Sequence, residues 1–170
     1  MNIIRENGDL KREKEELTKQ LHDKPPNIRI SEEKQAYRFE SGKSVMGPEF
    51  IQGLNENEFS RLAGEIVDRQ EEGRVKVDTL EIIGHTDGAP VGRGGNLDQR
   101  LPEILAGTRS DLSSLSPGSN NDLGLLRALA VRIQWEFYVE THPERDVLEK
   151  INVRCYSAGQ TILPHPDTKP

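Results

Sequence analysis

Apolar residues recur at helical spacing in two long stretches of the chain. Between residues 48 and 72 they fall in steps of three and four, which predicts one helix that stops at Gly73; a break near Asn55 is left open. A stronger helix is predicted from Asn120 or Asn121, either of which is a suitable N-cap, to residue 140. Both patterns give an apolar face of the kind that packs against a sheet.

Four shorter runs have the pattern of strands. Residues 75–83 end in an apolar run that stops at Gly84, as a strand buried on both faces would. Residues 151–156 alternate between apolar and polar, which predicts a strand with one wetter face. The runs 28–30 and 36–39 predict two further strands around a polar turn. The element order therefore indicates an α/β sandwich in which helices cover one mixed sheet.

The N-terminal residues 1–24 form a separate unit in this pattern. Ile3, Leu10 and Leu17 are seven apart and Leu21 follows four further on, which predicts a short coiled coil that makes a dimer. A solvated single helix is the alternative, because so few heptads are marginally stable alone. Prolines 25 and 26 end the helix, so residues 25–170 are expected to be the folded domain.

Composition narrows the functional classes. The net charge of -6 and the absence of a basic patch disfavour nucleic-acid binding. The single cysteine, Cys155, excludes a disulfide framework and is expected to be a core residue. No run approaches the roughly 20 apolar residues of a membrane span. The chain nevertheless begins inside a helical pattern, so we expect an upstream segment that anchors it.

The sequence GHTDG, residues 84–88, directly follows the best predicted strand. Binding residues gather at the carboxyl ends of strands in α/β sheets, so Asp87 is the predicted centre of a site. An alternative interpretation of Asp87 is that it only caps the turn after the strand. For Arg127, in the helix predicted from residue 120, the alternative to ligand binding is an internal salt bridge with Asp87 or Asp122. His85 is expected to be packed or hydrogen-bonded rather than a catalytic base.

The sequence gives little support for a metal site or for catalysis. Adjacent side chains in an extended segment diverge, so His85 and Asp87 are not expected to share a metal. The sequence contains no nucleophile elbow and no paired acid motif, so we expect that the chain is not an enzyme and uses no cofactor.

Residues 88–119 contain six glycines, three prolines and five serines, a composition of loops. Within this segment Leu97, Leu101, Ile104 and Leu105 keep a helical spacing, which predicts one short amphipathic helix docked on the body.

Two motifs together resemble a known family. IIGHTDG at residues 82–88 and NNDLGLLRA at residues 120–128, with residues 151–164 downstream, are similar to the OmpA-like (OmpA/MotB C-terminal) peptidoglycan-binding domain. The resemblance covers roughly residues 37–164. It implies the βαβαβ fold of that family, with residues 88–119 as an insertion beside the pocket that acts as a lid or a plug.

The resemblance also implies a ligand, the diaminopimelate of the cell-wall stem peptide. In the family's pattern Asp87 takes the ligand's ammonium and Arg127 its carboxylate, and arginine's planar fork suits a carboxylate. Thr86, Asn120 and His85 complete the candidate ligand-binding residues.

The expected function is noncovalent anchoring to peptidoglycan in the periplasm or cell envelope. The full-length protein is then expected to be a homodimer tethered to the inner membrane, attached through its upstream segment to a motor or channel subunit in the manner of a MotB-like stator. The alternative is an assembly module that kept the fold and lost the ligand.

Overall fold

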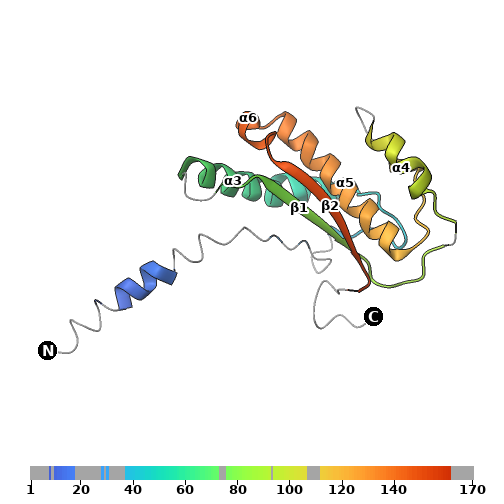
Figure 1. The fold of residues 1–170 in the computed structure, drawn as a ribbon, viewed down its shortest axis with the longest axis horizontal. Helices are drawn as coiled ribbons and strands as arrows, with labels where there is room; N and C mark the ends of the chain where they lie inside the picture. The colour runs from blue at the N-terminus through green and yellow to red at the C-terminus, as the bar shows by residue number, and fades with distance from the viewer. Residues whose placement is uncertain are drawn as a thin grey trace.

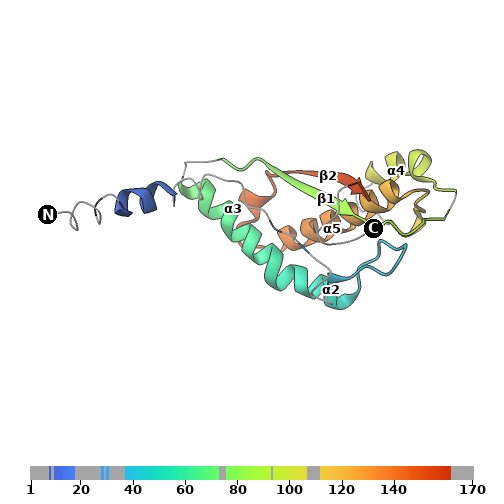
Figure 2. The same cartoon turned by 90° about the horizontal axis from the view of Figure 1, so that it is seen from below.

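The structure, a computed structural model, describes residues 8, 10–17, 28, 30, 37–72, 76–92, 94–106 and 112–161. Over these residues the chain is mixed α/β in two layers. The strands β1 (Thr79–His85) and β2 (Asn152–Gly159) lie side by side, and the long helices α3 (Ser60–Glu72) and α5 (Asn120–Glu140) lie on the same side of them (Figures 1 and 2). The remaining elements are α2 (Pro48–Gly53), the π-helix η2 (Leu54–Phe59), α4 (Leu97–Leu105), the 3-10 turn η3 (Leu112–Ser114) and α6 (Arg145–Leu148).

The two strands pair in parallel, with Leu80 opposite Val153 and Ile82 opposite Cys155. Burial alternates along β2 as predicted, with Val153 and Cys155 partly buried and Arg154 exposed between them. Both strands run beyond their predicted ends at residues 83 and 156: β1 reaches His85 and β2 reaches Gly159, and these two residues are the last pair of the ladder. The register shifts between Gly84 and His85, and such an irregularity re-aims the residues that follow it.

The prediction of a strand at residues 36–39 is wrong for its described part, because Tyr37 lies in a helical turn and Arg38 and Phe39 lie in no strand. Ile28 and Ile30 also lie in no strand, and Arg29 is outside the described residues. The rings of Tyr37 and Phe39 pack on Phe50, with centroids 5.5 and 4.9 Å away. Ring packing, rather than a backbone ladder, therefore attaches this segment, and the described sheet has two strands instead of the expected four.

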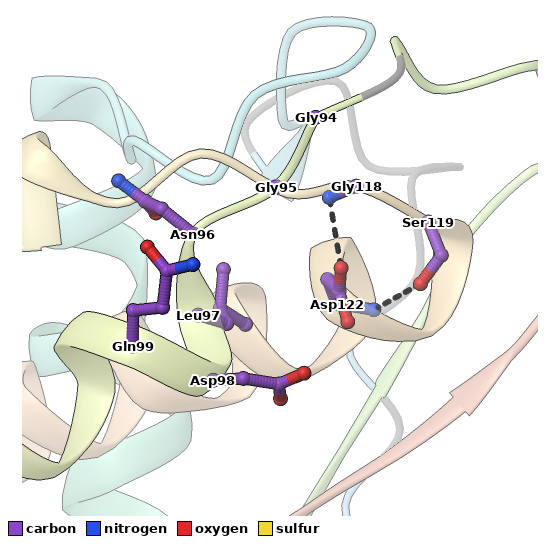
Figure 3. A pocket seen from close by; sticks show the side chains of 9 residues that line it. All are labelled: Gly94, Gly95, Asn96, Leu97, Asp98, Gln99, Gly118, Ser119 and Asp122. Atoms are coloured by element: carbon purple, nitrogen blue, oxygen red, sulfur yellow. Dashed lines mark hydrogen bonds between the residues drawn. The ribbon is translucent and has the colours of Figure 1, made fainter.

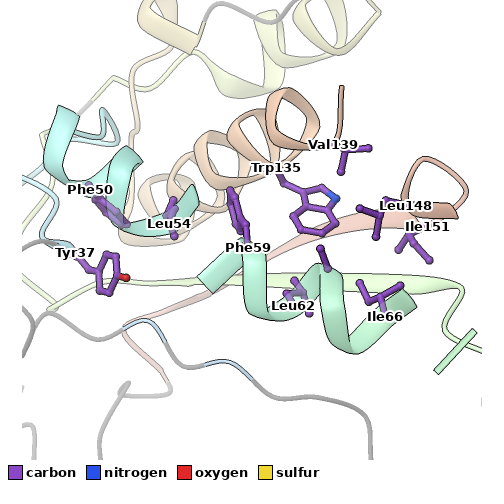
Figure 4. Packing of buried hydrophobic residues seen from close by; sticks show 11 residues of the cluster. Tyr37, Phe50, Leu54, Phe59, Leu62, Ile66, Trp135, Val139, Leu148 and Ile151 are labelled. Atoms are coloured by element: carbon purple, nitrogen blue, oxygen red, sulfur yellow. The ribbon is translucent and has the colours of Figure 1, made fainter. Parts of the chain in front are cut away.

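The main core lies between the helices and the strands (Figure 4). Phe59 meets the buried Trp135 edge to face, with ring centroids 5.3 Å apart. The helix predicted over residues 48–72 is confirmed to Glu72, and Gly73 lies outside the described residues. Near Asn55 the helix widens into the π-helical turns of η2 instead of breaking, and Gln134 Nε2 donates to Asn55 Oδ1 at 3.1 Å.

Two glycines bring α5 unusually close to β1. A Cβ atom built on Gly84 would lie 1.9 Å from the backbone oxygen of Gly124, and one on Gly124 would lie 2.3 Å from Ser157 Oγ. Neither position has room for a side chain. This contact sets the first turns of α5 directly against the end of β1, where the candidate site lies.

The insertion forms a second, smaller core on the flank of α5. The predicted short helix is confirmed as α4, and Leu97 and Leu115 pack against Leu126 and Leu129 of α5. Asp87 stays exposed, so the described part of the insertion is not a plug over that residue.

Cys155 packs beside this second core, and burial raises the pKa of its thiol from 9.0 to about 11. Because the thiolate is the reactive form, alkylation of the folded protein at pH 8 is expected to be about 100-fold slower than that of the denatured chain, as measured by mass spectrometry. The stability that comes from keeping the thiol neutral is full below pH 9 and is lost as the pH rises through 11. Equal labelling rates would contradict this burial.

The N-terminal prediction is confirmed as a helix over residues 10–17. Leu10 and Leu17 are 61% and 54% exposed, so the predicted seam is uncovered in the single chain and its dimer stays a prediction. Among the described residues, no helix has the length and apolar character needed to cross a bilayer.

Candidate functional site

Three chain segments meet at the candidate site: the end of β1, the end of β2 and the first turns of α5. The amide of Thr86 donates to Gly159 O at 3.0 Å, which joins the two strand ends. Asn120 Nδ2 donates to Gln160 Oε1 at 2.8 Å, which joins the start of α5 to the end of β2. The structure thus brings the motif after β1 together with the motif that opens α5.

Arg127 is buried next to the end of β1 and is only 6% exposed. Its Nη1 donates to His85 O and its Nε donates to Lys43 O, each at 3.2 Å. Its guanidinium carbon also lies 4.9 Å from the centre of the Phe39 ring, a cation–π distance. Arg127 therefore joins the 40–47 loop to the strand end. A direct contact between Arg127 and a ligand stays a prediction.

Asp87 is exposed beside this junction. Its Oδ1 accepts a hydrogen bond from the Ala89 amide at 3.1 Å, and Gly88 follows with φ of +80°. This hydrogen bond is the one expected from the alternative interpretation of Asp87, in which it caps the turn, and the arrangement is common for aspartate before glycine. The turn holds the carboxylate at the surface, where it can also meet a cationic group.

Thr86 and Asn120 hold buried polar atoms with no partner. Over the described part of the chain, Thr86 Oγ1 and Asn120 Oδ1 are buried and lack a hydrogen bond, and Thr86 is 2% exposed. Such atoms are rare in folded proteins because each loses its hydration without compensation. Both belong to the predicted site, and each can accept a hydrogen bond from a donor that a small local movement admits.

The start of α5 differs slightly from the prediction. The N-cap is Ser119, whose Oγ accepts from the Asp122 amide at 3.1 Å, and not Asn120 or Asn121. Ser119 is extended and precedes the first helical residue, which is the backbone geometry an N-cap needs. Asn120 is consequently released from capping and reaches Gln160.

A polar pocket of about 230 Å3 lies beside the site, where the insertion meets the first turn of α5 (Figure 3). None of the five predicted site residues lines it; its walls are Gly94, Gly95, Asn96, Leu97, Asp98, Gln99, Gly118, Ser119 and Asp122. Asp122 Oδ2 already accepts from the Gly118 amide, and the side chain of Asn96 bonds Ser114 and Ser116. Polar groups that line the pocket are thus already hydrogen-bonded within the protein, and these bonds hold the insertion to the start of α5.

Sequence reasoning missed two residues of the site. Gln160 directly follows β2, the same strand-end position that Thr86 has after β1, and that position was an available signal. Lys43 lies in a loop whose sequence carries no comparable mark, and only the contact of its carbonyl with Arg127 brings it to the site.

The described residues contain no group of three or more histidine, cysteine or acidic side chains arranged to hold a metal ion. In comparisons with known proteins, no family model, no curated protein and no solved structure matches this chain.

Proposed function

We propose that this chain has an OmpA-like fold and binds peptidoglycan noncovalently, through the diaminopimelate of its stem peptide. The observation that carries the proposal is the pair of unpartnered buried atoms, Thr86 Oγ1 and Asn120 Oδ1, next to the exposed carboxylate of Asp87. A ligand ammonium offers three N–H donors, which suits the exposed carboxylate and, once a local movement opens a path to them, the two buried neutral acceptors. Parallel pairing of β1 and β2 with α5 packed against both supports the fold.

Binding to a synthetic stem peptide that contains meso-diaminopimelate tests this proposal. Wild type is expected to give saturable heat by calorimetry. Asp87→Asn is expected to bind about 10- to 100-fold more weakly, because a hydrogen-bonded charge pair is lost. Thr86→Val is expected to weaken binding while leaving the folded protein as stable or more stable, since it removes a buried hydroxyl that has no partner.

Thr86→Ser is the matched control, because it keeps the hydroxyl and should keep most of the affinity. The proposal fails if wild type shows no saturable binding, or if Asp87→Asn binds as well as wild type. A Thr86→Val protein that is clearly less stable would indicate a structural role for the hydroxyl instead.

In the wider proposal, residues 1–24 form a dimeric coiled coil and the full-length protein is tethered to the inner membrane from the periplasmic side, as a stator-like anchor. The exposure of Leu10 and Leu17 along one helix supports the dimer. Wall binding would then resist the torque or pull of a membrane-embedded partner.

A second candidate function is an assembly module without a ligand. The observation in its favour is that Asp87 and Arg127 each have a structural task, the turn at Ala89 and the junction with Lys43. Both residues would then be explained by the fold alone, and the titration above separates the two functions.

A further inference from the structure

We infer that Gln160 is a further specificity-determining residue of the proposed site, and that its side-chain NH2 group donates to the carboxylate of the diaminopimelate. This inference rests on the proposed function. It adds a second donor for that carboxylate beside Arg127, and it leaves the ammonium with Asp87.

Gln160 contacts both motifs of the candidate site. Its Oε1 accepts the hydrogen bond from Asn120 Nδ2 at the start of α5, at 2.8 Å. The same side chain lies close to Gly88 of the GHTDG motif, because a Cβ atom built on Gly88 would lie 3.6 Å from Gln160 Oε1 and 3.7 Å from Gln160 Cβ. Gln160 therefore lies where the two motifs meet, next to the residue that follows Asp87.

A tight turn fixes the backbone of Gln160. The amide of Thr161 donates to Ala158 O at 3.1 Å, and Thr161 Oγ1 donates to the same oxygen at 2.7 Å. Within the turn Gly159 has φ of +51°, a conformation that favours glycine, and it also pairs with His85 at the end of the ladder. A side chain on a fixed turn is placed before the ligand arrives, which lowers the entropy lost on binding.

The hydrogen bond with Asn120 determines which end of the Gln160 amide is available. Asn120 Nδ2 can only donate, so Gln160 turns its oxygen toward Asn120 and keeps its NH2 group for another partner. Gln160 is exposed, and within the described part of the chain no residue accepts a hydrogen bond from its Nε2. An ammonium has only donors and cannot bind this group, whereas a carboxylate has only acceptors. Of the ligand's two charged groups, the carboxylate is the one that fits.

Asp87 and Gln160 flank the same glycine. Asp87 Oδ1 accepts from the Ala89 amide, which holds its carboxylate beside Gly88, and the Gln160 side chain also lies close to Gly88. In the diaminopimelate of a stem peptide, the free ammonium and a carboxylate are attached to one carbon atom. The protein groups that bind them must therefore lie close together, which two groups beside one glycine satisfy.

The test compares two synthetic stem peptides that differ at one residue, which is meso-diaminopimelate in one and lysine in the other. Lysine keeps the side-chain ammonium and lacks the carboxylate beside it. Wild type is expected to bind the diaminopimelate peptide about tenfold more tightly than the lysine peptide by calorimetry.

Gln160→Glu keeps an oxygen for Asn120 and replaces the NH2 donor by a negative charge. This variant is expected to bind the diaminopimelate peptide about 10- to 100-fold more weakly, because a donor is lost and two carboxylates repel each other. The lysine peptide has no carboxylate at this place, so it should bind at least as tightly as it binds wild type. Gln160→Met, which removes the donor without adding a charge, is expected to reduce the preference about fivefold.

Asn152→Asp is the matched control, because Asn152 is an exposed amide at the opposite end of β2. The same change of charge there is expected to leave the preference as in wild type.

The outcomes separate the two proposals. If wild type binds neither peptide, the proposed function fails and the assignment of Gln160 fails with it. If wild type prefers diaminopimelate and Gln160→Glu keeps that preference, the assignment is wrong while the proposed function stands. Equal binding of both peptides by wild type, or an equal loss for both peptides in Gln160→Glu, would also overturn the assignment, since neither result involves the carboxylate.

Discussion

Replacing Gly84 by alanine is expected to destabilise the folded protein by about 3 kcal/mol or more, at the upper end of what overpacking costs. The new Cβ atom would lie 1.9 Å from the backbone oxygen of Gly124 and 2.7 Å from its carbonyl carbon. Backbone atoms of a long helix cannot rotate away as a side chain can. The helix would have to move off β1, which would open the site at the start of α5.

Gly64→Ala is the matched control for this experiment. Gly64 lies within α3, and a Cβ atom there would meet nothing within 4 Å. Alanine at an open helical position is expected to stabilise the protein by roughly 0.5–1 kcal/mol. Urea denaturation of the two variants should therefore shift the midpoint in opposite directions. A Gly84→Ala protein as stable as wild type would contradict the close contact of α5 with β1.

Truncating Arg127 to alanine is expected to cost about 3 kcal/mol of stability, because two backbone carbonyls lose their donor and the Phe39 ring loses its cation. The stability should fall most in the two segments next to Arg127, in addition to the fall for the whole domain. Hydrogen exchange is expected to show faster opening around Lys43 and around the end of β1, the two segments that the guanidinium joins.

Arg132→Ala provides the comparison on the same helix. Arg132 makes an exposed pair with Glu136 at 2.7 Å, so its removal is expected to change stability by no more than about 0.5 kcal/mol. Similar losses of stability in the two variants would show that Arg127 does not join the 40–47 loop to the end of β1. The difference also matters for binding studies, because loss of binding in Arg127→Ala alone would not distinguish a ligand contact from a disordered site.

The sequence by itself determined the elements with strong internal patterns. The helical spacing of apolar residues predicted α4 and α5, and alternation predicted the wet and dry faces of β2. The location of the candidate site followed from GHTDG at the end of a strand, since that position depends only on local order along the chain. The structure joins the two motifs through the end of β2, where Thr86 bonds Gly159 and Asn120 bonds Gln160.

The tertiary structure alone decided what each of these residues does. A strand at residues 37–39 would need a neighbouring strand to pair with its backbone, and here the rings of Tyr37 and Phe39 pack on Phe50 instead. Gly84 and Gly124 matter only because two distant segments touch there, and Lys43 enters the site only because Arg127 binds its carbonyl. Burial and hydrogen bonding are properties of residues far apart in the chain, so no local pattern records that Arg127 is buried while Asp87 is exposed.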